Sequence, residues 1–225
     1  QTSRSGVFQS STTDSVATEY HFNLTDGIAK LMASSAGLSG PIKINNATRP
    51  EMRMTMDLMK IGLEVPFSFS DTLRDFDLTL DLRGLSVGDQ FWSLVDPQKA
   101  LPRDPLNLEM QVVGSGKLSF RDPKLPTSLS DLINDELLDK LDLRTLKISF
   151  LGTTLDASGL FAFDHTDKTP DAPPRIDATL DIGLQGGFAL LESLTDLGVL
   201  TSQQAFMAKA MSGMFAETQP NDMLK

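Results

Sequence analysis

The feature that most constrains the fold is an alternation of apolar and polar residues that recurs along most of the chain. Successive side chains of a β-strand point to opposite faces, so a period of two predicts strands with one apolar and one polar face. This pattern is typical of antiparallel sheets with one solvated side. The alternating segments are 20–24, 52–58, 61–69, 76–82, 106–112, 146–150, 155–163 and 176–182.

Helical spacing is confined to a few segments. Leucines at spacings of three and four predict a helix over 128–141 and another over 188–197, where Gly198 suits the position after a helix end. Thr201 and Gln204 form a capping-box signature, which predicts a further helix through about Phe215. Together the last two predict a helical hairpin, and a short helix is also expected at 28–35.

The last expected helix carries a wide apolar stripe, with Lys209 expected on its opposite face. The stripe comprises Phe206, Met207, Met211, Met214 and Phe215. Three interpretations remain open at this point: a core face packed on the sheet, a groove or lid for an apolar ligand, or a surface for a partner. Methionine is compatible with all three because its flexible, polarisable side chain adapts to varied neighbours.

The predicted fold class is therefore α+β, with a mainly antiparallel curved sheet and the C-terminal helical hairpin packed on its apolar face. The alternative is a β-sandwich with peripheral helices. We expect one domain over 1–225, because no composition change marks a linker. Segments 77–96 and 177–196 align without gaps and share seven identities, including DxTLD. This similarity indicates either a duplicated strand–helix unit or two amphipathic strands of common composition.

Charge and composition exclude several classes of function. The net charge is -10, which repels phosphate backbones, so nucleic acid is not expected as a partner. The chain has no cysteine, which rules out thiolate catalysis and thiolate metal sites. No apolar run approaches the roughly 20 residues of a membrane-spanning helix.

No motif predicts an enzyme, a metal or an organic cofactor. His165 stands near Asp164, Asp167 and Asp171, but their spacing differs from that of a calcium loop, so a solvated turn is expected. His21 is expected on the polar side of a strand. Segment 76–82 carries Asp77 and Asp81 on one exposed face, and Asp75 precedes them on the same face. We expect these acids to promote solubility. A hydrolase is the less favoured alternative.

Two blocks of the sequence resemble a known family. The first is FWSLVDPQKALPRDPLNLEM at 91–110, and the second runs from GLFAFDHTDKTPDAPPR at 159 to AMSGMFA at 216. They resemble the proteobacterial domain of unknown function 2125, from about residue 50 onward. The resemblance implies a periplasmic, β-rich part of a longer protein, tethered to the inner membrane by an anchor outside this chain. It also implies a further strand after Lys225, and it supplies no catalytic residue.

The expected function is a non-enzymatic binding or scaffolding domain of the cell envelope, with lipid or another envelope protein as partner. The alternative is a module that handles lipid or another apolar ligand in a groove under the hairpin at 188–216. An apolar face of this extent must be covered by something, and the sequence leaves open what covers it.

Overall fold

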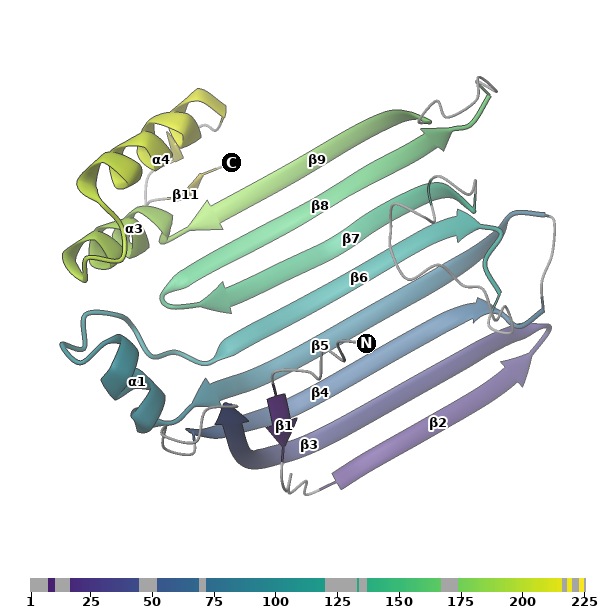
Figure 1. Cartoon of the computed structure of the whole chain (residues 1–225). Coiled ribbons are helices and arrows are strands. Elements are labelled where there is room, and N and C mark those ends of the chain that lie inside the picture. Colours follow the sequence, from purple (N-terminus) through teal and green to yellow (C-terminus); the bar gives the residue numbers. More distant parts are fainter. Residues whose placement is uncertain are drawn as a thin grey trace, which may run out of the picture.

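Eight long antiparallel strands form one open curved sheet, in which each strand pairs with its neighbour in sequence (Figure 1). The computed structural model describes residues 8–10, 17–44, 52–68, 72–119, 133, 137–166, 174–215, 218–219 and 223–224. The long strands are β2 (Ala17–Thr25), β3 (Ile28–Ile44), β4 (Met52–Pro66), β5 (Arg74–Val87), β6 (Leu106–Gly116), β7 (Leu138–Phe150), β8 (Thr153–Asp164) and β9 (Arg175–Gln185). Three short strands extend the sheet, namely β1 (Phe8–Ser10), β10 (Thr218–Gln219) and β11 (Met223–Leu224).

The observed fold confirms the predicted class. All described strands belong to one sheet, so the sandwich alternative does not apply. The alternating segments lie in β2 and β4 to β9, and the single strand β4 contains 52–58 and 61–66, while 67–68 follow it and 69 is outside the described residues. None of the helices in the described part of the chain is long and apolar enough to cross a membrane.

The expected helix at 28–35 is wrong, and the one at 128–141 is wrong at its end, although the described residue 133 is helical. Residues 28–35 begin β3, where Ala29 and Leu31 pair with Val65 and Leu63 of β4. The end of segment 128–141 lies in β7, while 128–132 and 134–136 are outside the described residues. In both places the ladder with a neighbouring strand supplies hydrogen bonds along the whole strand, and this tertiary pairing overrides a weak local helix propensity.

The alternation of apolar and polar residues in β5 breaks between Leu82 and Leu85. A bulge at this point keeps both leucines on the same face. Leu82 pairs with Leu108 and Leu85 pairs with Leu106, so β5 has one residue more than β6 between these pairs. Gly84 lies in the bulge with a φ of 68°, and its N–H donates to Asn107 Oδ1 at 3.0 Å. Leu82 and Leu85 therefore share a face although they are three residues apart. A bulge also bends its strand, which contributes to the curvature of the sheet.

The three helices lie beyond the same ends of the strands (Figure 1). They are α1 (Asp89–Val95), α3 (Gly187–Asp196) and α4 (Ser202–Phe215). The predicted hairpin of α3 and α4 is confirmed, and so is its capping box. The Gln204 N–H donates to Thr201 Oγ1 at 3.2 Å, and the Thr201 N–H donates to Gln204 Oε1 at 2.9 Å. Gly198 follows α3 with a φ of 72°.

One covered part of the sheet lies under α1. Trp92 and Leu101 are buried there, and Trp92 lines a 90 Å³ hollow with residues of three strands. Those residues are Leu85, Val87, Leu106 and Phe150. The segments 77–96 and 177–196 each form a strand followed by a helix, but their origin by duplication stays a prediction.

Candidate binding surface

The strand register gathers the apolar residues of all eight long strands on one side, which we call the apolar face. Residues that pair across neighbouring strands point to the same side, so the pairs trace this face from β2 to β9. Its members include Tyr20, Phe22, Leu24, Leu31, Ile61, Leu63, Leu78, Leu80, Leu108, Met110, Leu146, Ile148, Leu155, Ala157, Phe161, Ile176, Leu180 and Ile182.

Much of the apolar face remains accessible to solvent. Tyr20 of β2 is 75% exposed, and Ile176, Leu180 and Ile182 of β9 are 54%, 49% and 48% exposed. The sheet therefore presents apolar area that a finished monomeric core would bury.

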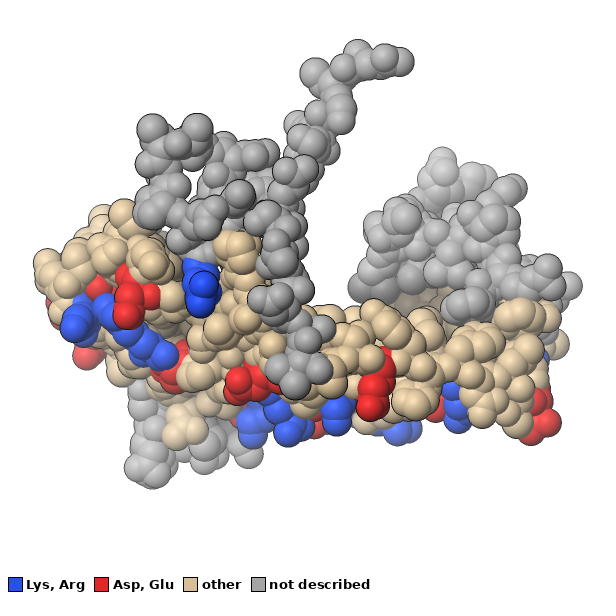
Figure 2. Space-filling view, turned by 90° about the horizontal axis from the view of Figure 1, so that it is seen from below, with Lys and Arg blue, Asp and Glu red and all other residues tan. Residues whose placement is uncertain are grey.

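The opposite side of the sheet is charged, and we call it the polar face. Cross-strand ion pairs on it join Lys30 to Glu64 at 2.7 Å and Lys147 to Asp156 at 3.6 Å. Figure 2 shows Lys, Arg, Asp and Glu side chains along one side of the sheet, while the described residues of the other side are mostly uncharged. Exposed pairs of this kind contribute little stability, so their main effect is to keep this side hydrated.

The expected packing of the α4 stripe on the sheet is corrected by the structure. Phe206 is 72% exposed and Met211 is 57% exposed, and Met207 is also exposed. The side chains of Met214 and Phe215 lie outside the described residues. The reason is the position of the hairpin, because α3 contacts α4 and β8 at the sheet end and does not carry α4 across the apolar face.

The side of α4 that faces α3 is small or polar. Among the side chains of α4 that the structure describes, the half-buried ones are Ala205, Lys209 and Ser212, at helical spacings of four and three. Lys209 Nζ lies 2.7 Å from Glu192 Oε1 and 5.5 Å from the ring centre of Phe188. Lys209, which was expected opposite the stripe, therefore joins α4 to α3.

The hollow between α3 and α4 has a volume of about 460 Å³, and Ala205 and Phe206 contribute to its lining together with polar side chains. Glu192, Thr195, Asp196, Ser202 and Lys209 contribute to it. The hydrogen bond from Lys209, reinforced by its charge, holds the pKa of Glu192 below its usual range. The larger apolar area available to a lipid lies on the sheet, where Tyr20, Leu180 and Ile182 are exposed.

We expect Met211→Asp to leave stability nearly unchanged. The side chain is exposed, so the new carboxylate stays hydrated, and surface substitutions usually change the free energy of unfolding by less than about 0.5 kcal/mol. Urea denaturation followed by circular dichroism measures this directly. A loss above about 2 kcal/mol would show that Met211 packs against protein in solution.

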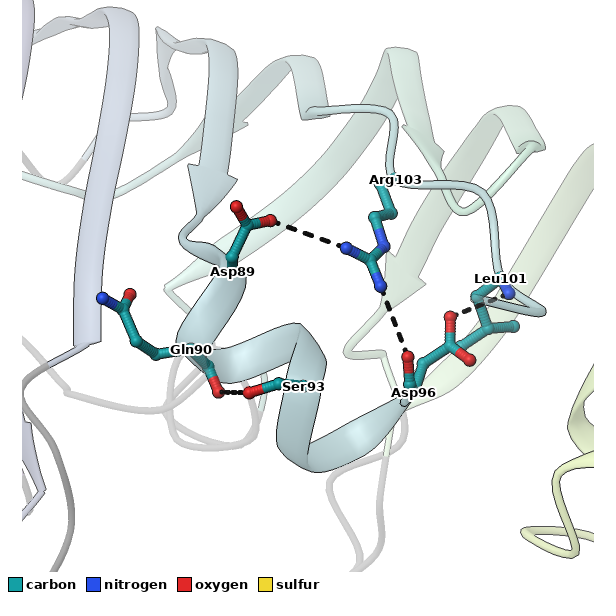
Figure 3. A network of polar contacts seen from close by, with 6 residues as sticks. All are labelled: Asp89, Gln90, Ser93, Asp96, Leu101 and Arg103. Carbon is teal, nitrogen blue, oxygen red and sulfur yellow. Dashed lines mark hydrogen bonds and ion pairs between the residues drawn. The ribbon is translucent and has the colours of Figure 1, made fainter. Parts of the chain in front are cut away.

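The most connected polar group of the described residues is structural. Asp96 is fully buried after α1 and accepts the N–H groups of Ala100 and Leu101 at 2.8 and 3.0 Å (Figure 3). Burial alone would raise the pKa of Asp96, but these hydrogen bonds and the Arg103 guanidinium outweigh burial and lower it. Arg103 also donates to the Asp96 carbonyl at 3.3 Å and lies 3.5 Å from Asp89. The network fixes the connection from α1 to β6.

The candidate catalytic and metal-binding groups do not assemble into a site. His165 Nε2 lies 2.9 Å from the Leu138 carbonyl, and Asp164 accepts the Thr166 N–H at 2.9 Å. The hydroxyl and N–H of Thr166 lower the pKa of Asp164. Asp167 and Asp171 lie outside the described residues. Among the residues with described positions, no three His, Cys, Asp or Glu side chains form a metal-binding group.

The acids of β5 are held by polar neighbours on the polar face. Gln111 Nε2 donates to Asp77 Oδ2 at 2.9 Å, and Arg83 Nη2 lies 2.8 Å from Asp81 Oδ2. His21 is exposed beside Glu19 on the same face, at 3.8 Å. These contacts are those of a solvated sheet surface, on which Glu19, His21, Asp81 and Gln111 line a hollow of about 390 Å³.

The sequence analysis named residues of α4 and missed the exposed residues at the two sheet edges. Tyr20 and Leu180 belong to alternating segments, so their side of the strand was predictable. Their exposure depends on what covers the sheet, which the alternation does not specify. No family model, curated protein or solved structure was found that matches the chain.

Proposed function

We propose that the chain is a non-enzymatic binding domain that holds the acyl chains of lipids on its apolar face. The observation that carries the proposal is the exposure of aliphatic and aromatic side chains at both edges of the apolar face, Tyr20 on β2 and Ile182 on β9, with the apolar side chains of the strands between them half-buried. A large exposed apolar area is a mark of an interaction site, since monomeric proteins rarely leave one without a function.

The chemistry of the face favours acyl chains over a protein surface. The backbone N–H and C=O groups of inner strands are used in the ladders, so the face offers mainly apolar side chains. Protein interfaces usually carry about one hydrogen bond per 100–200 Å² in addition to their apolar core. Acyl chains require no hydrogen bonds, and hydrophobic and dispersion contacts suffice to hold them.

The dimensions of the face also suit lipid. Eight strands about 4.8 Å apart make a sheet nearly 40 Å wide. The alternating residues from Ile176 to Ile182 on β9 cover about 20 Å along the strand. One leaflet of a bilayer has a hydrocarbon thickness of about 15 Å, half of the roughly 30 Å core. The face can therefore seat several extended acyl chains side by side.

The exposed stripe of α4 supports a second candidate, a scaffold that binds another envelope protein. Phe206, Met207 and Met211 form an apolar area bordered by charged groups of the hairpin such as Glu192. An apolar centre with a polar rim is the usual anatomy of a protein interface. The resemblance to an envelope family supports a periplasmic location for either candidate, with the chain tethered to the inner membrane.

The decisive experiment is native mass spectrometry, with lipid extraction, of protein purified from its own membrane in mild detergent. We expect the parent protein to carry lipid of defined mass, and Ile182→Glu to retain several-fold less. The charge would lie among the acyl chains, where an unpaired carboxylate is costly. Ile182 is 48% exposed, so the variant is expected to remain folded.

The matched control is Thr179→Glu, which adds the same charge to the polar face of the same strand. Thr179 is exposed and pairs with Leu160 on that face, so lipid content should equal that of the parent. Equal lipid content in all three proteins, or none in any, would refute the lipid proposal. A copurifying protein that is lost only from Met211→Asp would support the scaffold instead.

A further inference from the structure

Strand β9 leaves most of one sheet edge open. Within the described part of the chain it pairs with β8 along its whole length, but on its other side only Leu184 and Gln185 have a partner strand, which is β11. Native proteins usually protect such edges with short strands, lysine, proline or bulges. β9 is 11 residues long, contains neither lysine nor proline, and pairs with β8 without a register shift. This edge is therefore a template on which another strand can pair.

The β7–β8 hairpin determines which residues of β9 direct their backbone groups toward this edge. Its turn, Leu151–Gly152, has positive φ at both residues, 53° and 70°, so the flanking residues Phe150 and Thr153 form a hydrogen-bonded pair. Thr153 therefore faces β7, and the next residue, Thr154, faces Gln185 of β9. Backbone groups alternate along a strand, so the odd-numbered residues of β9 bond to β8. The residues whose N–H and C=O groups are directed outward are Ile176, Ala178, Leu180 and Ile182.

We propose that β9 pairs antiparallel with β9 of a second copy, in a two-fold symmetric dimer centred on Ala178. In this register Ala178 lies opposite its own copy and Ile176 lies opposite Leu180. These are residues with outward backbone groups, so they form hydrogen-bonded pairs, with about six hydrogen bonds across the axis. Pro174 has no N–H and ends the ladder before it reaches β11 of the other copy.

Charge supports this register. With Ala178 at the two-fold axis, Arg175 lies opposite Asp181 of the second copy, and the symmetry makes this pair twice. Both residues are exposed on the polar face. Within one chain Asp181 lies opposite Ser158 of β8, so it has no cation directly opposite it, and the second copy supplies one. Cross-strand pairs of opposite charge stabilise a ladder.

The neighbouring registers are less favourable. A register centred on Asp177 or Thr179 would place Asp177 opposite an aspartate of the second copy, and like charges directly opposite each other destabilise a ladder. A register centred on Leu180 would place Arg175 opposite Gln185, where β11 already lies. A register centred on Ile176 would pair fewer residues, because Pro174 ends the strand.

The dimer would join the two apolar faces. Residues opposite each other in an antiparallel pair point to the same side, so Ile176 and Leu180 of the two copies would contact each other on one continuous apolar face. They are 54% and 49% exposed in a single copy, and this contact would cover part of their area. The dimer goes beyond the proposed function and does not depend on it, because the pairing uses the backbone edge.

The absence of cysteine allows a direct test by cross-linking. In the proposed register Ala178→Cys places two thiols in a hydrogen-bonded pair with Cα atoms about 5.5 Å apart, within the range for a disulfide. Mild oxidation of the 225-residue chain should convert most of this variant to a disulfide dimer on a non-reducing gel. Leu180→Cys on the same face should give none, because its two copies would lie about 14 Å apart. A disulfide through Leu180→Cys and none through Ala178→Cys would contradict the register.

Two opposite charges at one position test the dimer without a covalent link. Thr179 would lie opposite Asp177 of the second copy, so Thr179→Lys adds two attractive pairs and Thr179→Glu adds two repulsive ones. Sedimentation velocity should show the parent as a dimer. The dissociation constant should be about twofold to thirtyfold lower for Thr179→Lys and higher by a similar factor for Thr179→Glu.

The matched controls are Thr79→Lys and Thr79→Glu on the inner strand β5. Thr79 is exposed on the polar face and stands between two aspartates in the same DxTLD sequence as Thr179, so these variants change the net charge equally. A monomeric parent at about 100 μM, or equal responses at the two positions, would overturn the dimer. Thr179→Glu is also the control for lipid content, so the same protein distinguishes a failure of the dimer from a failure of lipid binding.

Discussion

Trp92→Ala is expected to lower the free energy of unfolding by about 3–5 kcal/mol, the usual cost of truncating a buried aromatic side chain. Trp92 is only 6% exposed and meets Phe91 edge-on at 5.6 Å between ring centres. The Arg103 guanidinium lies 5.4 Å from the centre of its ring. The variant thus loses the anchor of α1 and a contact of the Asp96 network.

Urea denaturation followed by circular dichroism measures the loss, since the variant has no tryptophan for fluorescence. Leu94→Ala on the same helix is the control, because Leu94 is 59% exposed and its truncation should cost less than about 1 kcal/mol. Equal effects of the two substitutions would contradict the assignment of α1 as the cover of this end of the sheet.

Gly186→Ala is expected to cost about 2–5 kcal/mol through two separate effects. Gly186 lies between β9 and α3 with a φ of 76°, a left-handed conformation that costs a residue with a Cβ about 1–2 kcal/mol. A Cβ there would also overlap the carbonyl oxygen of Gly152, in the turn between β7 and β8. Relieving that overlap requires backbone movement, and overpacking of this kind typically costs about 1–3 kcal/mol more.

Gly198→Ala separates the two effects. Gly198 has nearly the same φ, 72°, but no atom lies within 4 Å of the Cβ that alanine would add. Gly198→Ala should therefore lower the free energy of unfolding only through the left-handed backbone conformation, by about 1–2 kcal/mol. Thermal unfolding of both variants gives the comparison, and equal melting temperatures would show that the contact between Gly186 and the β7–β8 turn is not tight in solution.

The strands were predictable because their signal is local. Leu78, Leu80 and Leu82 alternate with polar residues and lie on one face of β5, as expected. The missed start of β3 also had a local signal, because Asp26–Gly27 separates two short apolar segments and is a strong hairpin marker. Both residues have the positive φ that such a turn requires, 52° and 75°. The weak helical spacing at 28–35 was given too much weight.

The surroundings of the helices could not be predicted in the same way. The capping box and the period of α4 specified a helix and its stripe, but they contain no information about the element that covers the stripe. The position of Phe206 and Met211 at the sheet end depends on where β9 stops and on the Gly186 junction with the β7–β8 turn. Those are long-range contacts, and a single sequence does not reveal them.

The order of the strands has a consequence for how the chain reaches its native state. From β2 to β9 each strand pairs with the one before it, so every long ladder connects segments adjacent in sequence. Closing a loop between neighbouring strands costs less entropy than joining distant segments, and contacts that are local in sequence favour fast folding. The sheet can therefore form one hairpin at a time, because no long strand has to pair with a segment far away in the sequence. A chain that emerges gradually, from a ribosome or through a membrane pore, can order its first strands before its last residues arrive.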